Sequence, residues 1–203
     1  MIIVIASILI AIIWSYVSNY ISTKKAAEEA QIQSASVITD LATIDASEFD
    51  EVVRTEFATA KAKAEENDSG NKFTALEVNL PSLELKSGET RYIFSSDTDK
   101  TNNWTISFSQ LTTNYLRADI PKDDYLGNLT AINTALWKFN YVTAIQIAEK
   151  NGGQDWRETN GLDGIDAILK QNSAGILVWN IKYTNRQNTF SINIDAATGK
   201  IIN

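Results

Sequence analysis

Acidic side chains that alternate along the chain are the first candidates for chemistry, because a calcium-binding loop spaces its ligands in this way. The segment "DTDKTNNW" places Asp97, Asp99 and Thr101 at alternate positions. However, Asn102 stands where such a loop needs a glycine, and Phe108 stands where it needs a bidentate glutamate. We therefore predict a polar hairpin turn and no metal site.

A second pair of acids, Asp163 and Asp166, lies in the segment "GLDGID". A catalytic carboxylate pair needs a setting that separates the two pKa values, and a glycine-rich loop does not indicate one. The chain also has no histidine and no cysteine, which excludes imidazole bases, thiol nucleophiles and Cys/His zinc sites. We expect no catalytic residue and no cofactor, and hence a protein that is not an enzyme.

A third candidate is the segment "QDWRE", which places Trp156 and Arg157 next to the expected end of a helix. Aromatic and guanidinium side chains are frequent anchors at protein interfaces, so this pair is a candidate partner-binding site. The alternative is that Trp156 packs under a sheet, and the residues alone leave both possibilities open.

The chain has 203 residues, 44% of them hydrophobic, which is enough to bury the core of one domain or of two small ones. Its net charge is -7 and its pI is about 4.7. The acidity lies in residues 24–70, which carry 5 basic and 11 acidic side chains. Because no basic stripe is present to neutralise phosphates, we exclude nucleic acid as a partner.

The first 21 residues carry no charged side chain, and a helix of that length crosses a hydrocarbon core of about 30 Å. The alternative is a cleaved signal peptide, but no small-x-small cleavage pattern follows the apolar run, so we predict an uncleaved membrane anchor over residues 1–23. Lys24 and Lys25 follow this run, and the positive-inside rule alone would then place the rest of the chain in the cytoplasm.

Residues 24–70 have a helical pattern and are predicted to form an acidic stalk and a first amphipathic helix. Phe49, Val53 and Phe57 share one face at helical spacing, with Ser47 as N-cap and Asp50 as the acid of a capping box. Residues 71–130 then change to strand periodicity, and residues 131–203 repeat a helix, over about 131–150, followed by strands. We therefore predict an α+β protein with two helix-plus-antiparallel-sheet units.

Short sequence motifs recur in the two predicted units. Expected strands with the pattern W-x-I-x-[FY] begin at Trp104 and Trp179, and in both an aromatic residue 11 positions later opens another strand. Leu83 and Leu85 are also assigned to a strand of the first unit. Duplication of a helix-and-sheet unit is one explanation, and chance similarity of short motifs is the other.

The C-terminal segment "NYVTAIQIAEKNGG", followed by strands that end in "DAATGKIIN", resembles the PepSY family. In the second motif Gly199 is expected at positive φ, so that Ile201 and Ile202 fold back on the sheet. The resemblance covers about residues 138–203, and a weaker copy is suspected over about 47–124. The insertion "QDWRETNGLDG" lengthens the family pattern.

Members of the family are typically anchored or secreted modules outside the bacterial cytoplasm, including propeptides of thermolysin-type metallopeptidases. The resemblance implies a binding or regulatory module without catalytic activity, whose C-terminal part is extracytoplasmic and whose protein partner is a peptidase or an envelope protein. The alternative is a pilin-like filament subunit with an apolar N-terminal helix and a β-rich head. That alternative lacks the acidic fifth residue of type IV pilins, since Ile5 stands there.

Overall fold

The computed structural model describes residues 41, 44–85, 87–109, 115–122, 126–127 and 129–202. Leu41–Asn203 form one compact unit. The predicted membrane anchor and residues 24–40 of the predicted stalk lie outside the described residues. Among the helices that are described, none combines the length and the apolar character that a membrane span requires.

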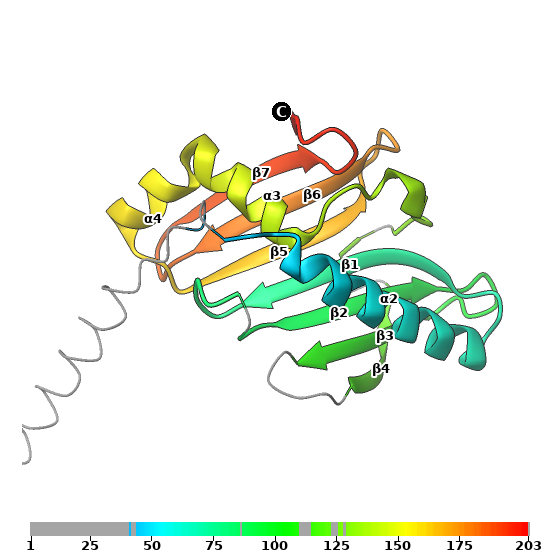
Figure 1. Cartoon of the computed structure of the whole chain (residues 1–203). Helices are drawn as coiled ribbons and strands as arrows, with labels where there is room; N and C mark the ends of the chain where they lie inside the picture. Colours follow the sequence, from blue (N-terminus) through cyan, green and yellow to red (C-terminus); the bar gives the residue numbers. More distant parts are fainter. Residues whose placement is uncertain are drawn as a thin grey trace, which may run out of the picture. The chain divides into compact units, whose positions relative to one another are not determined.

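The architecture is α+β, as predicted, and its centre is a single antiparallel sheet of eight strands (Figure 1). The strand order is β4-β3-β2-β1-β5-β6-β7-β8. The strands are β1 (Lys72–Leu80), β2 (Glu89–Ser95), β3 (Asn102–Ser109), β4 (Tyr115–Pro121), β5 (Gly164–Gln171), β6 (Leu177–Thr184), β7 (Thr189–Asp195) and β8 (Ile201–Ile202).

Three α-helices of the described part of the chain lie on one face of the sheet (Figure 1). They are α2 (Glu48–Asn67), α3 (Tyr141–Ala148) and α4 (Gln154–Asn160), with a 3-10 turn η2 (Thr134–Leu136) before α3 and a π-turn η3 (Glu149–Gly153) after it. Ser47 stands at the expected N-cap of α2, but its side chain makes no capping bond. Its hydroxyl instead donates to Asp45 Oδ1 at 2.7 Å.

Several predicted boundaries were wrong. The helix expected over 131–150 begins only at Tyr141, because the Asn140 side chain caps the chain there. The segment treated as an inserted loop contains α4, which a kink at Gly152 (φ +105°) separates from α3. Leu83 and Leu85 lie between β1 and β2 and belong to no strand.

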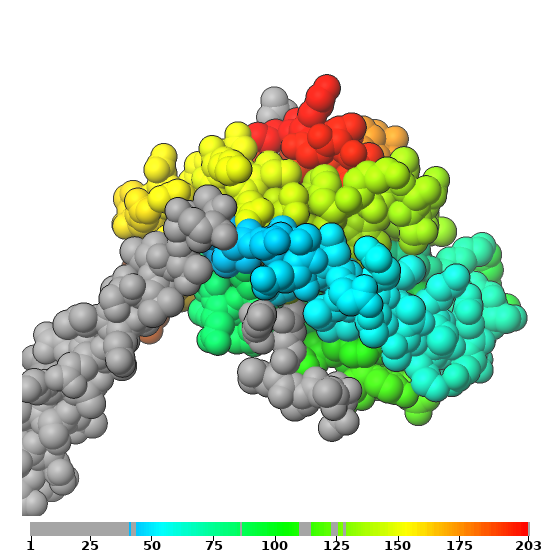
Figure 2. Space-filling view, in the orientation of Figure 1, coloured from blue at the N-terminus to red at the C-terminus, as the bar shows by residue number. Residues whose placement is uncertain are grey.

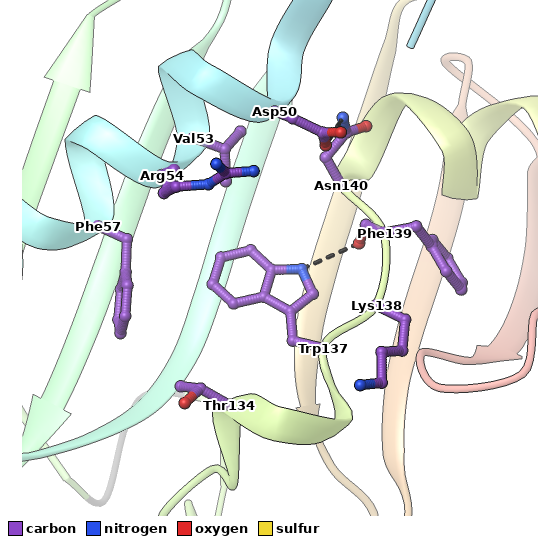
Figure 3. Close-up of a pocket in the computed structure, with 9 residues that line it drawn as sticks. All are labelled: Asp50, Val53, Arg54, Phe57, Thr134, Trp137, Lys138, Phe139 and Asn140. Carbon is purple, nitrogen blue, oxygen red and sulfur yellow. Dashed lines mark hydrogen bonds between the residues drawn. The ribbon is translucent and has the colours of Figure 1, made fainter. Parts of the chain in front are cut away.

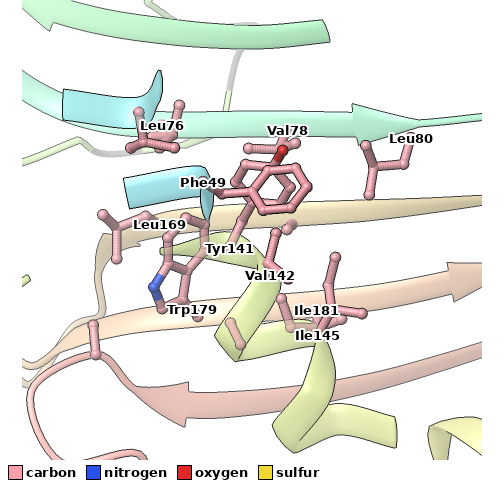
Figure 4. Close-up of a cluster of buried hydrophobic side chains, with 14 of the residues drawn as sticks. Phe49, Leu76, Val78, Leu80, Tyr141, Val142, Ile145, Leu169, Trp179 and Ile181 are labelled. Atoms are coloured by element: carbon pink, nitrogen blue, oxygen red, sulfur yellow. The ribbon is translucent and has the colours of Figure 1, made fainter. Parts of the chain in front are cut away.

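The hydrophobic core lies between the helices and the sheet (Figure 4). Leu76, Val78 and Leu80 alternate along β1 toward the helices and are fully buried. Tyr141 of α3 packs edge-on against Phe49 of α2, with ring centroids 5.9 Å apart. Full burial of each such aliphatic side chain contributes roughly 1.5 to 3 kcal/mol, so α2 and α3 are bound to the sheet mainly by this layer.

The two halves of the chain meet at the pairing of β1 with β5, in the middle of the sheet. In each half the helices come first, α2 in one and α3 and α4 in the other, and four consecutive strands follow. The two tryptophan motifs do not occupy equivalent strands, since Trp104 lies in β3, the third strand of its half, and Trp179 lies in β6, the second. The recurring motifs therefore do not align the two halves, and the division near residue 130 stays a prediction.

The C-terminal turn has the predicted conformation. Gly199 has φ +71°, and β8 pairs with β7 through the partners Ile194 and Ile201. The Asp195 side chain accepts hydrogen bonds from the backbone N–H groups of Ala197 and Thr198 at 2.8 and 3.0 Å. The short last strand is thus fixed by an Asp-turn and one residue in the left-handed region.

Polar side chains form a row on the sheet face opposite the helices. Cross-strand pairing places Asn79 beside Asp166, and Asp166 beside Lys182. The Asn79 side chain donates to Asp166 Oδ1 at 2.7 Å. A sheet with one apolar face and one polar face is typical of antiparallel architectures that leave one side in water.

Candidate binding groove

A groove of about 270 Å³ lies between α2 and the segment that leads into α3. The two elements lie side by side on one face of the molecule (Figure 2). The side chains that line the groove are mainly aromatic and polar or charged: Asp50, Val53, Arg54, Phe57, Thr134, Trp137, Lys138, Phe139 and Asn140.

Trp137 forms the floor of the groove and is held from several sides (Figure 3). Its indole stacks on Phe73 of β1 at 5.9 Å and meets Phe57 of α2 edge-on at 5.7 Å. Its N–H donates to the Phe139 carbonyl at 2.9 Å, and the same carbonyl accepts the indole N–H of Trp179 at 3.2 Å. The floor is therefore a fixed aromatic surface.

Asn140 closes one end of the groove and joins the two helices. Its Oδ1 accepts the backbone N–H groups of Val142 and Thr143 at 2.9 and 3.2 Å, which caps α3. Its Nδ2 donates to the Ala46 carbonyl and to Asp50 Oδ1, each at 2.7 Å. This buried amide uses its donor and acceptor sides at once, so it fixes the N-termini of α2 and α3 relative to each other.

The rim of the groove carries two exposed cations, Arg54 from α2 and Lys138 from the opposite side (Figure 3). The one carboxylate in the lining, that of Asp50, accepts a hydrogen bond from Asn140. An aromatic floor below two cations suits a ligand segment that combines an apolar side chain with a carboxylate.

The acids that resembled a calcium loop form the turn between β2 and β3, as predicted. Asp99 Oδ1 accepts backbone N–H groups from Thr101 and Asn102 at 2.8 and 2.9 Å. These bonds, together with one from the Thr101 hydroxyl, lower the pKa of Asp99 to about 2. Lys72 forms an ion pair with Asp97 at 3.0 Å. The described residues contain no cluster of acids suited to a metal ion.

The other acid pair is divided between two environments. Asp166 lies in β5 and accepts the hydrogen bond from Asn79, whereas Asp163 precedes β5 and lines a shallow hollow beside the turn between β6 and β7. The structure therefore does not bring the two side chains into one buried site.

Trp156 and Arg157 both lie in α4. Trp156 packs on the rings of Tyr183 and Phe190, at 6.3 and 6.5 Å. Arg157 is only 7% exposed, and its guanidinium binds Glu149 Oε2 at 2.8 and 2.9 Å. This geometry favours the packing alternative, because the arginine already has a partner inside the fold. A role of the pair in partner binding stays a prediction.

The groove was not predicted from the sequence, which placed Asp50, Val53 and Phe57 only in an amphipathic helix. Trp137 was missed because the segment around it was assigned to a helix, whereas it follows η2 in an extended conformation. Asn140 precedes "YVTAIQIA", and an asparagine directly before an apolar helical repeat is a recognised N-cap signal. That signal could have identified both the start of α3 and one end of the groove.

Comparison with protein families gives a match that begins at the groove. Residues 140–203 match the PepSY family model, described as "Peptidase propeptide and YPEB domain". The segment 140–203 is thus similar to PepSY domains. The matched residues begin with the cap Asn140 and include α3, α4 and strands β5 to β8. The prediction for the C-terminal segment is confirmed, and the suspected weaker copy over 47–124 stays a prediction.

Among solved structures, the chain is similar to a protein described as a "putative lipoprotein" from Clostridium difficile 630. The TM-score is 0.48 and the sequence identity is 15%, over 73% of this chain and 90% of that chain. No curated protein matches the chain.

Proposed function

We infer that this protein is a non-catalytic, extracytoplasmic PepSY-type binding module, which holds an acidic, partly apolar segment of a protein partner in the groove. The observation that carries this inference is the rigid aromatic floor formed by Trp137 beneath the exposed cations Arg54 and Lys138. The family description names a peptidase propeptide, so a peptidase or another envelope protein is the proposed class of partner.

Site-specific photo-crosslinking in the producing cells tests the proposal. A benzoylphenylalanine residue at Thr134, which is exposed and lines the groove, keeps both cations and should give an adduct with a single peptidase or envelope protein. The same probe at Lys182, on the opposite face of the sheet, is the matched control and should give none. Arg54→Glu should abolish the Thr134 adduct without lowering thermal stability, because Arg54 is exposed. Equal adducts from both probe positions would contradict a groove-specific partner.

The proposed location has its own test. In intact cells, externally added protease should digest the chain after about Lys25, while detergent-free lysis should leave the undigested protein in the membrane pellet. Protection of the folded part in intact cells would contradict the outward orientation.

A further inference from the structure

β4 is the last strand on one side of the sheet, and no described segment pairs with its outer edge. Its residues are mostly exposed, and Leu116 has 75% of its surface accessible. An outer strand with free backbone groups is a template for another strand, unless the sequence prevents such pairing.

The backbone pattern identifies the groups on β4 that are free to pair. Just beyond the strand, the Lys122 N–H donates to the Thr101 carbonyl of the facing segment at 2.8 Å. Antiparallel pairs alternate between bonded and non-bonded, so Ala118 also directs its backbone groups toward β3. The Ala118 carbonyl indeed accepts the Thr105 hydroxyl at 3.0 Å. Arg117 and Asp119 therefore direct their N–H and C=O groups outward.

We propose that β4 pairs with β4 of a second copy of this chain, in an antiparallel register centred on Ala118. The segment "LRADI" is self-complementary about that residue. Arg117 would lie directly opposite Asp119 of the second copy, and Leu116 opposite Ile120. The outward backbone groups of Arg117 and Asp119 fall in bonded pairs in this register, as the alternation requires.

Neighbouring registers are disfavoured by charge. Outward backbone groups occur on every second residue, so the next allowed pairings place either Arg117 opposite Arg117 or Asp119 opposite Asp119. Charges on an outer strand commonly prevent pairing. Here, two opposite charges flank Ala118 symmetrically, so one register brings unlike charges together and its neighbours do not.

The side chains that would meet on each face of the paired strands are also compatible with one another. Arg117 lies on the helix side, where its guanidinium is 5.8 Å from the ring centre of Trp104, and Asp119 pairs with Trp104 across the strands. Leu116 and Ala118 point to the other face, since they pair with Ser107 and Thr105. A twofold axis through Ala118 would therefore place charges on one face and cover the exposed Leu116 on the other.

Disulfide trapping of the full chain in the producing cells tests the register, and the absence of native cysteines makes each single-cysteine variant unambiguous. Ala118→Cys should form a disulfide-linked dimer, because the Cα atoms of a central non-bonded pair lie about 4.5 Å apart. Leu116→Cys is the matched control. In the proposed register, position 116 of one copy is offset by four residues along the strand from position 116 of the other. The two side chains are then about 14 Å apart and cannot form a disulfide.

Charge exchange in the Ala118→Cys background tests the pairing itself. Arg117→Asp alone, or Asp119→Arg alone, should lower dimer yield about tenfold by placing like charges opposite each other. The double variant should restore the yield, although it loses the contact of Arg117 with Trp104, as Arg117→Asp alone does.

Three results would overturn the proposal: linkage of Leu116→Cys as efficient as that of Ala118→Cys, insensitivity of the dimer to single charge reversal, or linkage of the Ala118→Cys variant to a different protein only. The last result would show that an extended segment of another protein occupies the edge.

Discussion

At the scale of single residues, Asn140 connects two helices, because its buried side chain caps α3 and donates hydrogen bonds to Asp50 of α2 and to Ala46, which precedes that helix. Asn140→Asp keeps the cap but removes both donated hydrogen bonds and places a carboxylate beside Asp50. We expect a loss of about 2 to 3 kcal/mol in the free energy of unfolding, measured by urea denaturation. Adding Asp50→Asn should recover part of the loss, and wild-type stability of Asn140→Asp would contradict this account.

The buried ion pair between Glu149 and Arg157 makes a second prediction at this scale. Arg157→Met leaves the Glu149 carboxylate buried without its partner, which should cost about 3 to 5 kcal/mol. The double variant Glu149→Leu with Arg157→Met should return most of that stability in the same thermal-unfolding series. Equal stability of the single variant and wild type would contradict the claim that this ion pair compensates for the burial of Glu149.

Tyr183→Phe is the control for that series. Burial and the nearby Glu149 carboxylate raise the pKa of Tyr183, so its hydroxyl stays protonated at all ordinary pH values. Within the described residues this hydroxyl makes no hydrogen bond at ordinary distance. We therefore expect its removal to cost no stability, because a buried hydroxyl without a partner carries an uncompensated desolvation cost.

At the scale of elements, the turn between β7 and β8 depends on Gly199. Its φ of +71° is a conformation that β-branched residues avoid. Gly199→Val should lower the free energy of unfolding by about 1 to 3 kcal/mol. Thr198→Ala, in the same turn, is the matched control and should stay near wild type in thermal unfolding.

The end of α2 is fixed by an acid whose ionisation stabilises the fold. Asp68 accepts hydrogen bonds from the hydroxyls of Ser96 and Thr98 and from the Gly70 N–H, which lower its pKa to about 2. Because the folded-state pKa lies below the unfolded value of 3.8, this stabilisation is present above pH 3.8 and is lost as the pH falls toward 2. The stability difference between wild type and Asp68→Asn should therefore narrow over that interval.

The ionisation of Glu56 should change stability with pH in the opposite direction, so Glu56 serves as the comparison for Asp68. Burial raises its pKa, although Thr90 and Tyr92 donate hydrogen bonds to it. Protonation then favours the folded state, so lowering the pH through the raised folded-state pKa adds stability, which Glu56→Gln would not gain. If the two variants show the same pH dependence in thermal unfolding, these assignments are wrong.

Elements with a clear period were predictable from the sequence, and segments fixed by tertiary contacts were not. The alternation of apolar and polar residues predicted β6 and β7, and the segment "DAATGK" predicted the last turn, because both signals are local. The start of α3 was misplaced by about ten residues, since Trp137 is held by contacts with Phe57 and Phe73 from other elements. The groove was missed for the same reason: its walls are separated by about eighty residues in the sequence.

At the scale of the whole molecule, α2 belongs to the core of the folded unit. Phe49, Val53, Ala60 and Ala64 are all buried. We expect residues 41–203 to fold as a soluble domain and residues 70–203 to unfold or aggregate, because removing α2 exposes the apolar side of β1 to β3. Circular dichroism and gel filtration of the two fragments check this. A cooperative melt of residues 70–203 would contradict it.

The central pairing of β1 with β5 also bears on how the chain is synthesised. About ninety residues separate the end of β1 from the end of β5. At roughly 5 to 20 residues per second, a ribosome leaves the inner edge of β1 without its neighbour for about 5 to 20 s. During that time the nascent half-sheet exposes a strand able to pair with other nascent chains. Glu77 and Asn79, in the middle of β1, are the polar residues that would oppose such aggregation.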